Sequence, residues 1–157
     1  MNIRRLTAED LPRLREYWKK HWGDEFVVAH GVIYHPDTLD GFVALDDEEW
    51  VGEITYTVSG TECEIVSLDS LREGQGIGTK LIDTVVEEAR NRNCRRLLLI
   101  TTNDNLHALG FYQRRGFELA RIHRRALDET RRLKPSVPLI GMNNIPLRDE
   151  IELEMNL

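Results

Sequence analysis

Apolar residues recur at helical spacing in two segments of the chain, and this pattern predicts two amphipathic helices. The first helix follows Asp10, which can act as its N-cap, and its first turn accommodates Pro12. The second runs from Gly78 to about Asn91, a length of about four turns. The periodic positions are Leu11, Leu14, Trp18 and Trp22 in the first, and Ile77, Leu81, Ile82, Val85, Val86 and Ala89 in the second.

Three strands are predicted between these helices, at residues 42–45, 50–58 and 62–69. Ser59-Gly60 provides a hairpin turn between the last two, so the three should form an antiparallel meander. After the second helix, "RRLLLITT" is a continuous apolar run, which is typical of a strand buried in a parallel pair at the centre of a sheet.

A short helix at 106–115, a strand and a closing strand complete the predicted fold. The helix has Asn103, Asp104 or Asn105 as its N-cap and Gly116 just after its end. The strands are "FELARIH" and "IELEMNL". This order of elements predicts an α/β fold with a mixed sheet.

Length and composition fit one domain, residues 1–157, because 41% of the 157 residues are hydrophobic. No apolar run spans about 18 residues and no signal region opens the chain, so we expect a cytoplasmic protein without a membrane segment.

A formal charge of −6 argues against a nucleic-acid partner. Cys63 and Cys94 lack metal-ligand spacing, so we expect buried reduced thiols and no metal.

The stretch "LREGQGIGTKL" at residues 71–81 places three glycines between a predicted strand and a predicted helix. Unpaired N–H groups and the positive end of the helix dipole favour a phosphate or pyrophosphate at such a turn. The turn is not a P-loop, because Thr79 separates Gly78 from Lys80, and "GQGIGT" does not fit the dinucleotide fingerprint. A tight turn without a ligand is the alternative.

A second motif lies downstream, in "NLHALGFYQRRGFE". It reads Asn-x-x-Ala-x-x-Phe-Tyr-x-x-x-Gly-Phe from Asn105 to Phe117. With the glycine turn, it resembles the GNAT N-acetyltransferase superfamily over at least residues 42–117. The resemblance implies a mixed, mostly antiparallel sheet of six to seven strands flanked by helices, with a splay between the two central parallel strands. One departure is Glu73, which stands where the family usually has Gln or Arg.

The resemblance also implies a binding site for acetyl-CoA as the cosubstrate. Main-chain N–H groups of the turn would hold the pyrophosphate, and the main chain at Leu68 would pair with the pantetheine arm and polarise the thioester carbonyl. Asn105 and Tyr112 complete the implied cofactor contacts. The turn residues are Gly74, Gln75, Gly76, Ile77, Gly78 and Thr79.

The implied reaction is direct attack of a primary amine on the acetyl thioester. Tyr112 stands at the family's acid position and would protonate the departing thiolate; an aromatic ring packed beneath the cofactor is the alternative. Glu62 and Glu64 share a strand face and are the two candidates for the general base, with solvated edge carboxylates as the alternative.

The acceptor is then an amine-bearing small molecule, peptide or protein. Two other functions fit the same residues: an acetyl-CoA sensor without turnover, and transfer of another acyl group or transfer to a hydroxyl. An insert at 124–149 precedes the last strand and contains Arg148 and Asp149, with Glu150 directly after it. It either lines the acceptor pocket or docks a second copy of the chain in a homodimer.

Overall fold

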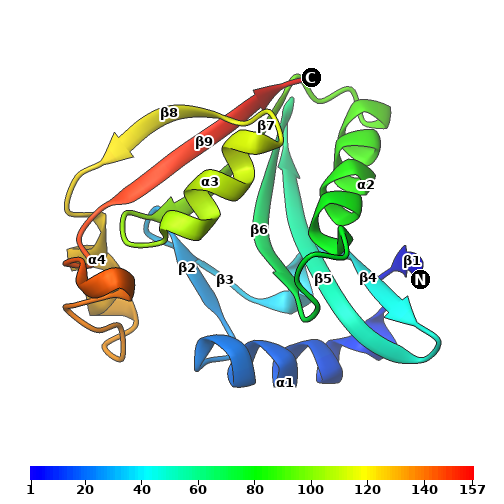
Figure 1. Ribbon diagram of the computed structural model, residues 1–157, viewed down its shortest axis with the longest axis horizontal. Coiled ribbons are helices and arrows are strands. Elements are labelled where there is room, and N and C mark those ends of the chain that lie inside the picture. The colour runs from blue at the N-terminus through cyan, green and yellow to red at the C-terminus, as the bar shows by residue number, and fades with distance from the viewer. The chain divides into compact units, whose positions relative to one another are not determined.

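The computed structural model describes all 157 residues, which fold into two compact units. The first unit contains Met1–Val27, Tyr34–Leu97 and Leu157, and the second contains Val28–Ile33 and Leu98–Asn156. Seven strands, contributed by both units, belong to one sheet (Figure 1). No helix has the length and apolar character that crossing a bilayer requires.

The first unit contains four neighbouring strands and two long helices. The strands pair antiparallel in the order β1-β4-β5-β6. This arrangement confirms the predicted meander and both predicted helices, and adds one strand at the N-terminus. The elements are β1 (Asn2–Arg5), α1 (Leu11–Trp22), β4 (Asp40–Asp46), β5 (Glu49–Ser59), β6 (Glu62–Ser70) and α2 (Ile77–Asn91).

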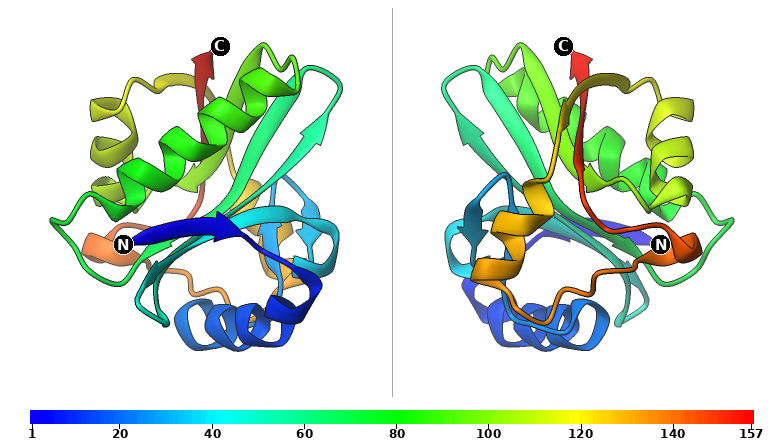
Figure 2. Two further views of the ribbon diagram at one scale, coloured as in Figure 1. Left: turned by 90° about the vertical axis from the view of Figure 1, so that its right-hand side faces the viewer. Right: turned by 90° about the vertical axis from the view of Figure 1, so that its left-hand side faces the viewer.

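Helices α1 and α2 cover opposite faces of β4 and β5 (Figure 2). On one face, Val43 packs in a cluster with Trp18 of α1. Gly52 pairs with Ala44, the next residue along β4, so it lies on the other face. There, a Cβ atom on Gly52 would meet Ile77 of α2. We call the two sides the α1 face and the α2 face.

A bulge in β6 decides which of its side chains reach the α1 face. Thr55 pairs with Ser67 and the next residue, Tyr56, pairs with Ile65, so Val66 is the extra residue. Beyond the bulge, Glu64 pairs with Thr57. Glu64 and Ser67 therefore share the α1 face although they are three positions apart, a spacing that puts side chains on opposite faces of a regular strand.

The second unit contains the helices and strands predicted for the last third of the chain. Strands β8 and β9 run side by side and pair antiparallel (Figure 1). In the sheet, β9 lies between β7 and β8. The elements are β7 (Arg96–Thr102), α3 (Leu106–Arg114), β8 (Glu118–His123), α4 (Ala126–Leu133) and β9 (Glu150–Asn156).

A small hairpin of β2 (Val27–Ala29) and β3 (Val32–Tyr34) was not predicted. It turns at His30 and Gly31, whose φ angles of 41° and 78° are left-handed. The His30 N–H donates to both carboxylate oxygens of Glu150, at 3.0 and 3.2 Å. This contact anchors the tip of the hairpin to the start of β9.

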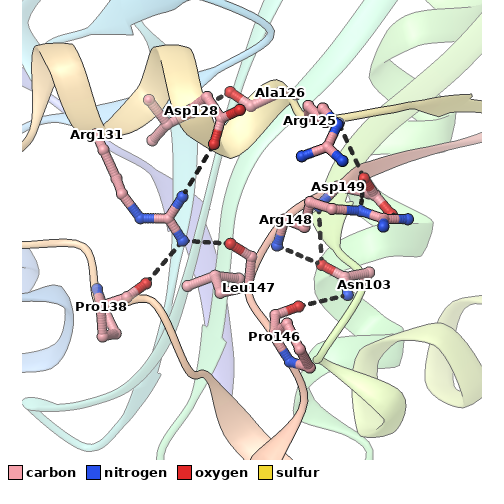
Figure 3. Close-up of polar contacts among 11 residues, drawn as sticks. Asn103, Arg125, Ala126, Asp128, Arg131, Pro138, Pro146, Leu147, Arg148 and Asp149 are labelled. Carbon is pink, nitrogen blue, oxygen red and sulfur yellow. Dashed lines mark hydrogen bonds and ion pairs between the residues drawn. The ribbon is translucent and has the colours of Figure 1, made fainter.

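The 124–149 insert contains α4 and is tied to the end of β7 by polar contacts (Figure 3). Asn103 accepts hydrogen bonds from the N–H groups of Arg148 and Asp149, at 3.1 and 3.0 Å. Asp149 in turn accepts from the N–H of Arg125, the residue at the N-cap of α4, at 2.9 Å. Arg131 of α4 donates to the carbonyl oxygens of Pro138 and Leu147. The insert is therefore an ordered loop held at both ends.

The mostly antiparallel seven-stranded sheet flanked by helices confirms the predicted fold class. The buried, unbridged Cys63 and Cys94 confirm the prediction of reduced thiols. The splay between the two central strands and the assignment of residues 1–157 to a single domain stay predictions.

Candidate active site

The glycine turn between β6 and α2 has the backbone shape that an anion site requires. Gly74 and Gly76 have φ angles of 77° and 73°, which side chains other than glycine rarely adopt. Gly76 is the N-cap residue of α2, and no side chain caps the helix. A Cβ atom on either glycine would meet nothing within 4 Å, so the turn faces open space. The start of α2 therefore presents main-chain N–H groups and the positive helix end at the surface.

The two side chains just before the first glycine of the turn are either paired elsewhere or exposed. Arg72 forms ion pairs with Asp46 and with Glu49, the latter at 3.0 Å, and so ties the turn to the β4–β5 hairpin. Glu73, the departure from the family pattern, is exposed.

Helix α3, in the second unit, positions Asn105 and Tyr112. The Asn105 side chain accepts a hydrogen bond from the N–H of Ala108 at 3.0 Å and caps the helix, as one of the three predicted N-cap alternatives. Tyr112 is half-buried and meets the rings of Phe111 and Phe117 edge-on, with centroids 5.2 and 5.5 Å away. Local packing thus fixes the ring. The proposed roles of both residues at the cofactor stay predictions.

The two predicted base candidates lie in different surroundings on β6. Glu62 is 52% exposed and forms an ion pair with Arg96 at 3.0 Å. Glu64 is half-buried and accepts a hydrogen bond from the Tyr34 hydroxyl at 3.1 Å. Burial, reinforced by the charge of Glu64, raises the pKa of Tyr34 well above its ordinary value. Neither carboxylate is thereby assigned as the base.

A buried carboxyl group that the sequence interpretation missed lies on β5. Glu53 is fully buried, and its Oε2 accepts a hydrogen bond from the Ser67 hydroxyl at 3.0 Å. Its Oε1 has no hydrogen-bond partner. Burial raises the pKa of Glu53 to about 8; the charge of Asp69 acts in the same direction, while the Ser67 hydrogen bond opposes both. The available signal was one glutamate inside the apolar stretch "WVGEITYTV".

The family assignment rests on a match that covers most of the chain. The model of the Acetyltransferase (GNAT) family matches residues 3–117. The chain belongs to this family. It is 47% identical to the uncharacterized protein YxbD of Bacillus subtilis over 142 residues, which are 90% of this chain and 89% of YxbD. It is 33% identical to N-alpha-acetyltransferase 30 of Schizosaccharomyces pombe over 98 residues, 57% of this chain and 65% of that protein.

A solved structure shows the same fold over nearly the whole chain. A GNAT family acetyltransferase from Elizabethkingia anophelis, crystallised with acetyl-CoA bound, superposes with a TM-score of 0.73 and covers 99% of this chain and 97% of its own. The sequence identity is 23%, so this similarity is evidence for the fold only. The resemblance stated from the two motifs is thereby confirmed: this chain is a GNAT acetyltransferase.

Proposed function

We propose that this GNAT acetyltransferase transfers the acetyl group of acetyl-CoA to a primary amine by direct attack. The main support for the proposal is the N-terminus of α2, which no side chain caps. It follows Gly74 and Gly76, two glycines with left-handed φ angles that face open space. Such a helix end binds a pyrophosphate through its N–H groups and its dipole. The residues involved are Gly74, Gln75, Gly76, Ile77, Gly78 and Thr79.

In this proposal the remaining cofactor contacts come from Leu68, Asn105 and Tyr112. The Leu68 main chain pairs with pantetheine and polarises the thioester carbonyl, which stabilises the tetrahedral intermediate. Collapse of that intermediate breaks the C–S bond, and the Tyr112 hydroxyl supplies a proton to the thiolate. The acceptor is an amine on a small molecule, a peptide or a protein; an N-alpha-acetyltransferase among the relatives supports this range.

The first test is calorimetric titration of the protein with acetyl-CoA, dephospho-coenzyme A and NAD. We expect binding of acetyl-CoA and little or no binding of NAD. Gly76→Val serves as the site variant, because a β-branched residue cannot easily adopt a φ of 73°. Equal affinity of wild type and Gly76→Val for acetyl-CoA would contradict the assignment of the turn.

The second test separates an enzyme from a sensor. Tyr112→Phe keeps the ring contacts with Phe111 and Phe117 and removes only the hydroxyl. In an amine library screened by coenzyme A release, we expect turnover to fall about 100-fold, at unchanged acetyl-CoA affinity. Tyr56→Phe is the matched control, because the buried Tyr56 hydroxyl has no hydrogen-bond partner. A wild-type protein that binds acetyl-CoA but acetylates no amine would be a sensor.

A further inference from the structure

We infer that Asp69 and Glu53 form a carboxyl pair that takes up the proton of the acceptor amine. Asp69 receives the proton as a catalytic residue, and Glu53 acts behind it as a positioning residue. This inference rests on the proposed acetyl transfer and assigns its general base to a place outside the two glutamates expected from the sequence.

The two carboxyl groups lie directly opposite each other on neighbouring strands. Glu53 of β5 pairs with Asp69 of β6 in the antiparallel register, so both side chains lie on the α1 face. A chain of hydroxyls backs the pair: the Thr55 and Ser67 oxygens are 2.5 Å apart, and Ser67 donates to Glu53 at 3.0 Å. Asp69 is half-exposed while Glu53 is fully buried. Only Asp69 can therefore meet a substrate directly.

Buried polar atoms without partners gather around this pair. Besides Oε1 of Glu53, they include the Tyr17 hydroxyl and Nε1 of Trp18, both on α1. Tyr17 also interacts with Asp69, and Trp18 with Glu53, although none of the three unpartnered atoms forms a hydrogen bond of good geometry. Leaving such groups unpaired in the interior is unfavourable, so a purely structural core would favour apolar side chains here. An arrangement that tolerates this cost is typical of a functional site.

Burial favours the protonated form of Glu53 in this pair. Burial and the charge of Asp69 together hold a proton on Glu53 at neutral pH, since they raise its pKa to about 8. They also raise the pKa of Tyr17 well above its ordinary value, so Tyr17 stays neutral. Burial therefore makes Glu53 the protonated member of the pair, while Asp69 is half-exposed. Two carboxyl groups whose environments differ in this way are a common acid–base arrangement.

The position of Asp69 suits the reaction. It directly follows Leu68, the residue whose N–H is proposed to hold the thioester carbonyl. Its Oδ1 accepts a hydrogen bond from the Ser70 N–H at 2.8 Å, which fixes the carboxylate near the strand. By contrast, Glu62 is paired with Arg96, and Glu64 accepts from Tyr34.

The step balances as a simple proton transfer. One N–H bond of the ammonium group breaks, and its proton forms an O–H bond on the Asp69 carboxylate. The resulting lone pair on nitrogen attacks the thioester carbonyl. The nitrogen of the intermediate has a positive charge after the attack, and it loses its second proton to solvent. When the intermediate collapses, the sulfur leaves with the electron pair of the C–S bond and takes a proton from the Tyr112 hydroxyl. Asp69 then releases its proton to solvent, and Tyr112 takes a proton from solvent, so both residues return to their starting states.

The experiment measures kcat/KM from pH 6 to 10 for wild type, Asp69→Asn and Glu53→Gln, with an amine that the wild type acetylates. We expect Asp69→Asn to lose about 10²- to 10⁴-fold at pH 7. The loss should shrink as the pH approaches the pKa of the amine, which then arrives already neutral. Glu53→Gln should abolish a wild-type inflection near pH 8, where Glu53 ionises beside Asp69. Acetyl-CoA affinity should not change in either variant.

Controls make the result specific. Asp40→Asn removes a 57% exposed carboxylate from β4 and should leave the whole pH profile unchanged. Thermal unfolding of each variant detects misfolding, and Asp69→Glu should restore part of the activity if the carboxylate itself matters. The inference is overturned if Asp69→Asn keeps the wild-type profile, or if Glu62→Gln or Glu64→Gln produces the defect instead. If the wild type acetylates no amine, the proposed function itself is refuted, and the role of the carboxyl pair falls with it. A defect in the variants alone tests only the carboxyl pair.

Discussion

Replacing Glu53 by glutamine should make the protein relatively more stable as the pH rises. Glutamine has nearly the same shape and can still accept the Ser67 hydrogen bond, but it does not ionise. In the native protein the Glu53 pKa is about 8, against an ordinary value of 4.5. Between these two pH values the unfolded chain has released the Glu53 proton while the folded protein still holds it.

The sign and size of the effect follow from this difference in bound protons. A carboxyl whose folded pKa is raised adds no penalty below pH 4.5, destabilises the fold progressively as the pH rises, and reaches its full penalty above pH 8. The slope is about 1.4 kcal/mol per pH unit for one proton. From pH 5 to pH 8, the free energy of unfolding of the wild type should therefore fall by about 3 kcal/mol relative to Glu53→Gln.

Urea unfolding followed by tryptophan fluorescence measures this difference, because Trp18 and Trp50 are buried in the first unit. Curves taken at each half pH unit from 5 to 9 give the difference between the two proteins as a function of pH. Glu118→Gln, which changes an exposed glutamate on β8, should follow the wild type throughout. If the wild type and Glu53→Gln instead gave parallel stability curves from pH 5 to pH 8, Glu53 would not be held protonated and the reasoning would fail.

Three further predictions concern packing, the insert and the thiols. Gly52→Ala should destabilise by about 1–3 kcal/mol in urea unfolding, since its Cβ would lie 2.8 Å from the Ile77 side chain and 2.9 Å from a β6 carbonyl oxygen. Asn103→Ala removes the acceptor for two N–H groups of the insert, so limited proteolysis should cut the 124–149 segment faster than in wild type. Burial raises the pKa of Cys63 to about 12 and that of Cys94 as well, so neither thiol should react with Ellman's reagent at pH 8 until the protein is unfolded.

The elements that the sequence predicts well are those with strong local signals. Helix α2 has an apolar period and a glycine at its start, and α3 has Asn105 as its N-cap. Strand β1 was missed because Asn2–Arg5 has one apolar residue and is a strand only through its pairing with β4. The β2–β3 hairpin was missed for a similar reason: three-residue strands carry too little pattern to be recognised.

In the candidate site too, the features set by local sequence were predictable, and those set by contacts between distant residues were not. The shape of the glycine turn is local, so the sequence predicted it, and the φ angles of Gly74 and Gly76 agree. The state of Glu53 depends on α1 above it and on Ser67 from the next strand, which are distant in sequence. A glutamate in a strand is ordinarily interpreted as a solvent-facing residue, and only the fold reveals that this one is buried.

The bulge at Val66 explains why alternation along β6 was a poor guide to the general base. In a regular strand, Glu62 and Glu64 would share a face with Leu68, and Asp69 would point the other way. The extra residue shifts the register by one, which moves side chains before it to the opposite face. Glu64 and Asp69 consequently both lie on the α1 face, where Glu53 is also found. Among the carboxyl groups on this face, Asp69 alone is both half-exposed and opposite a buried, protonated partner.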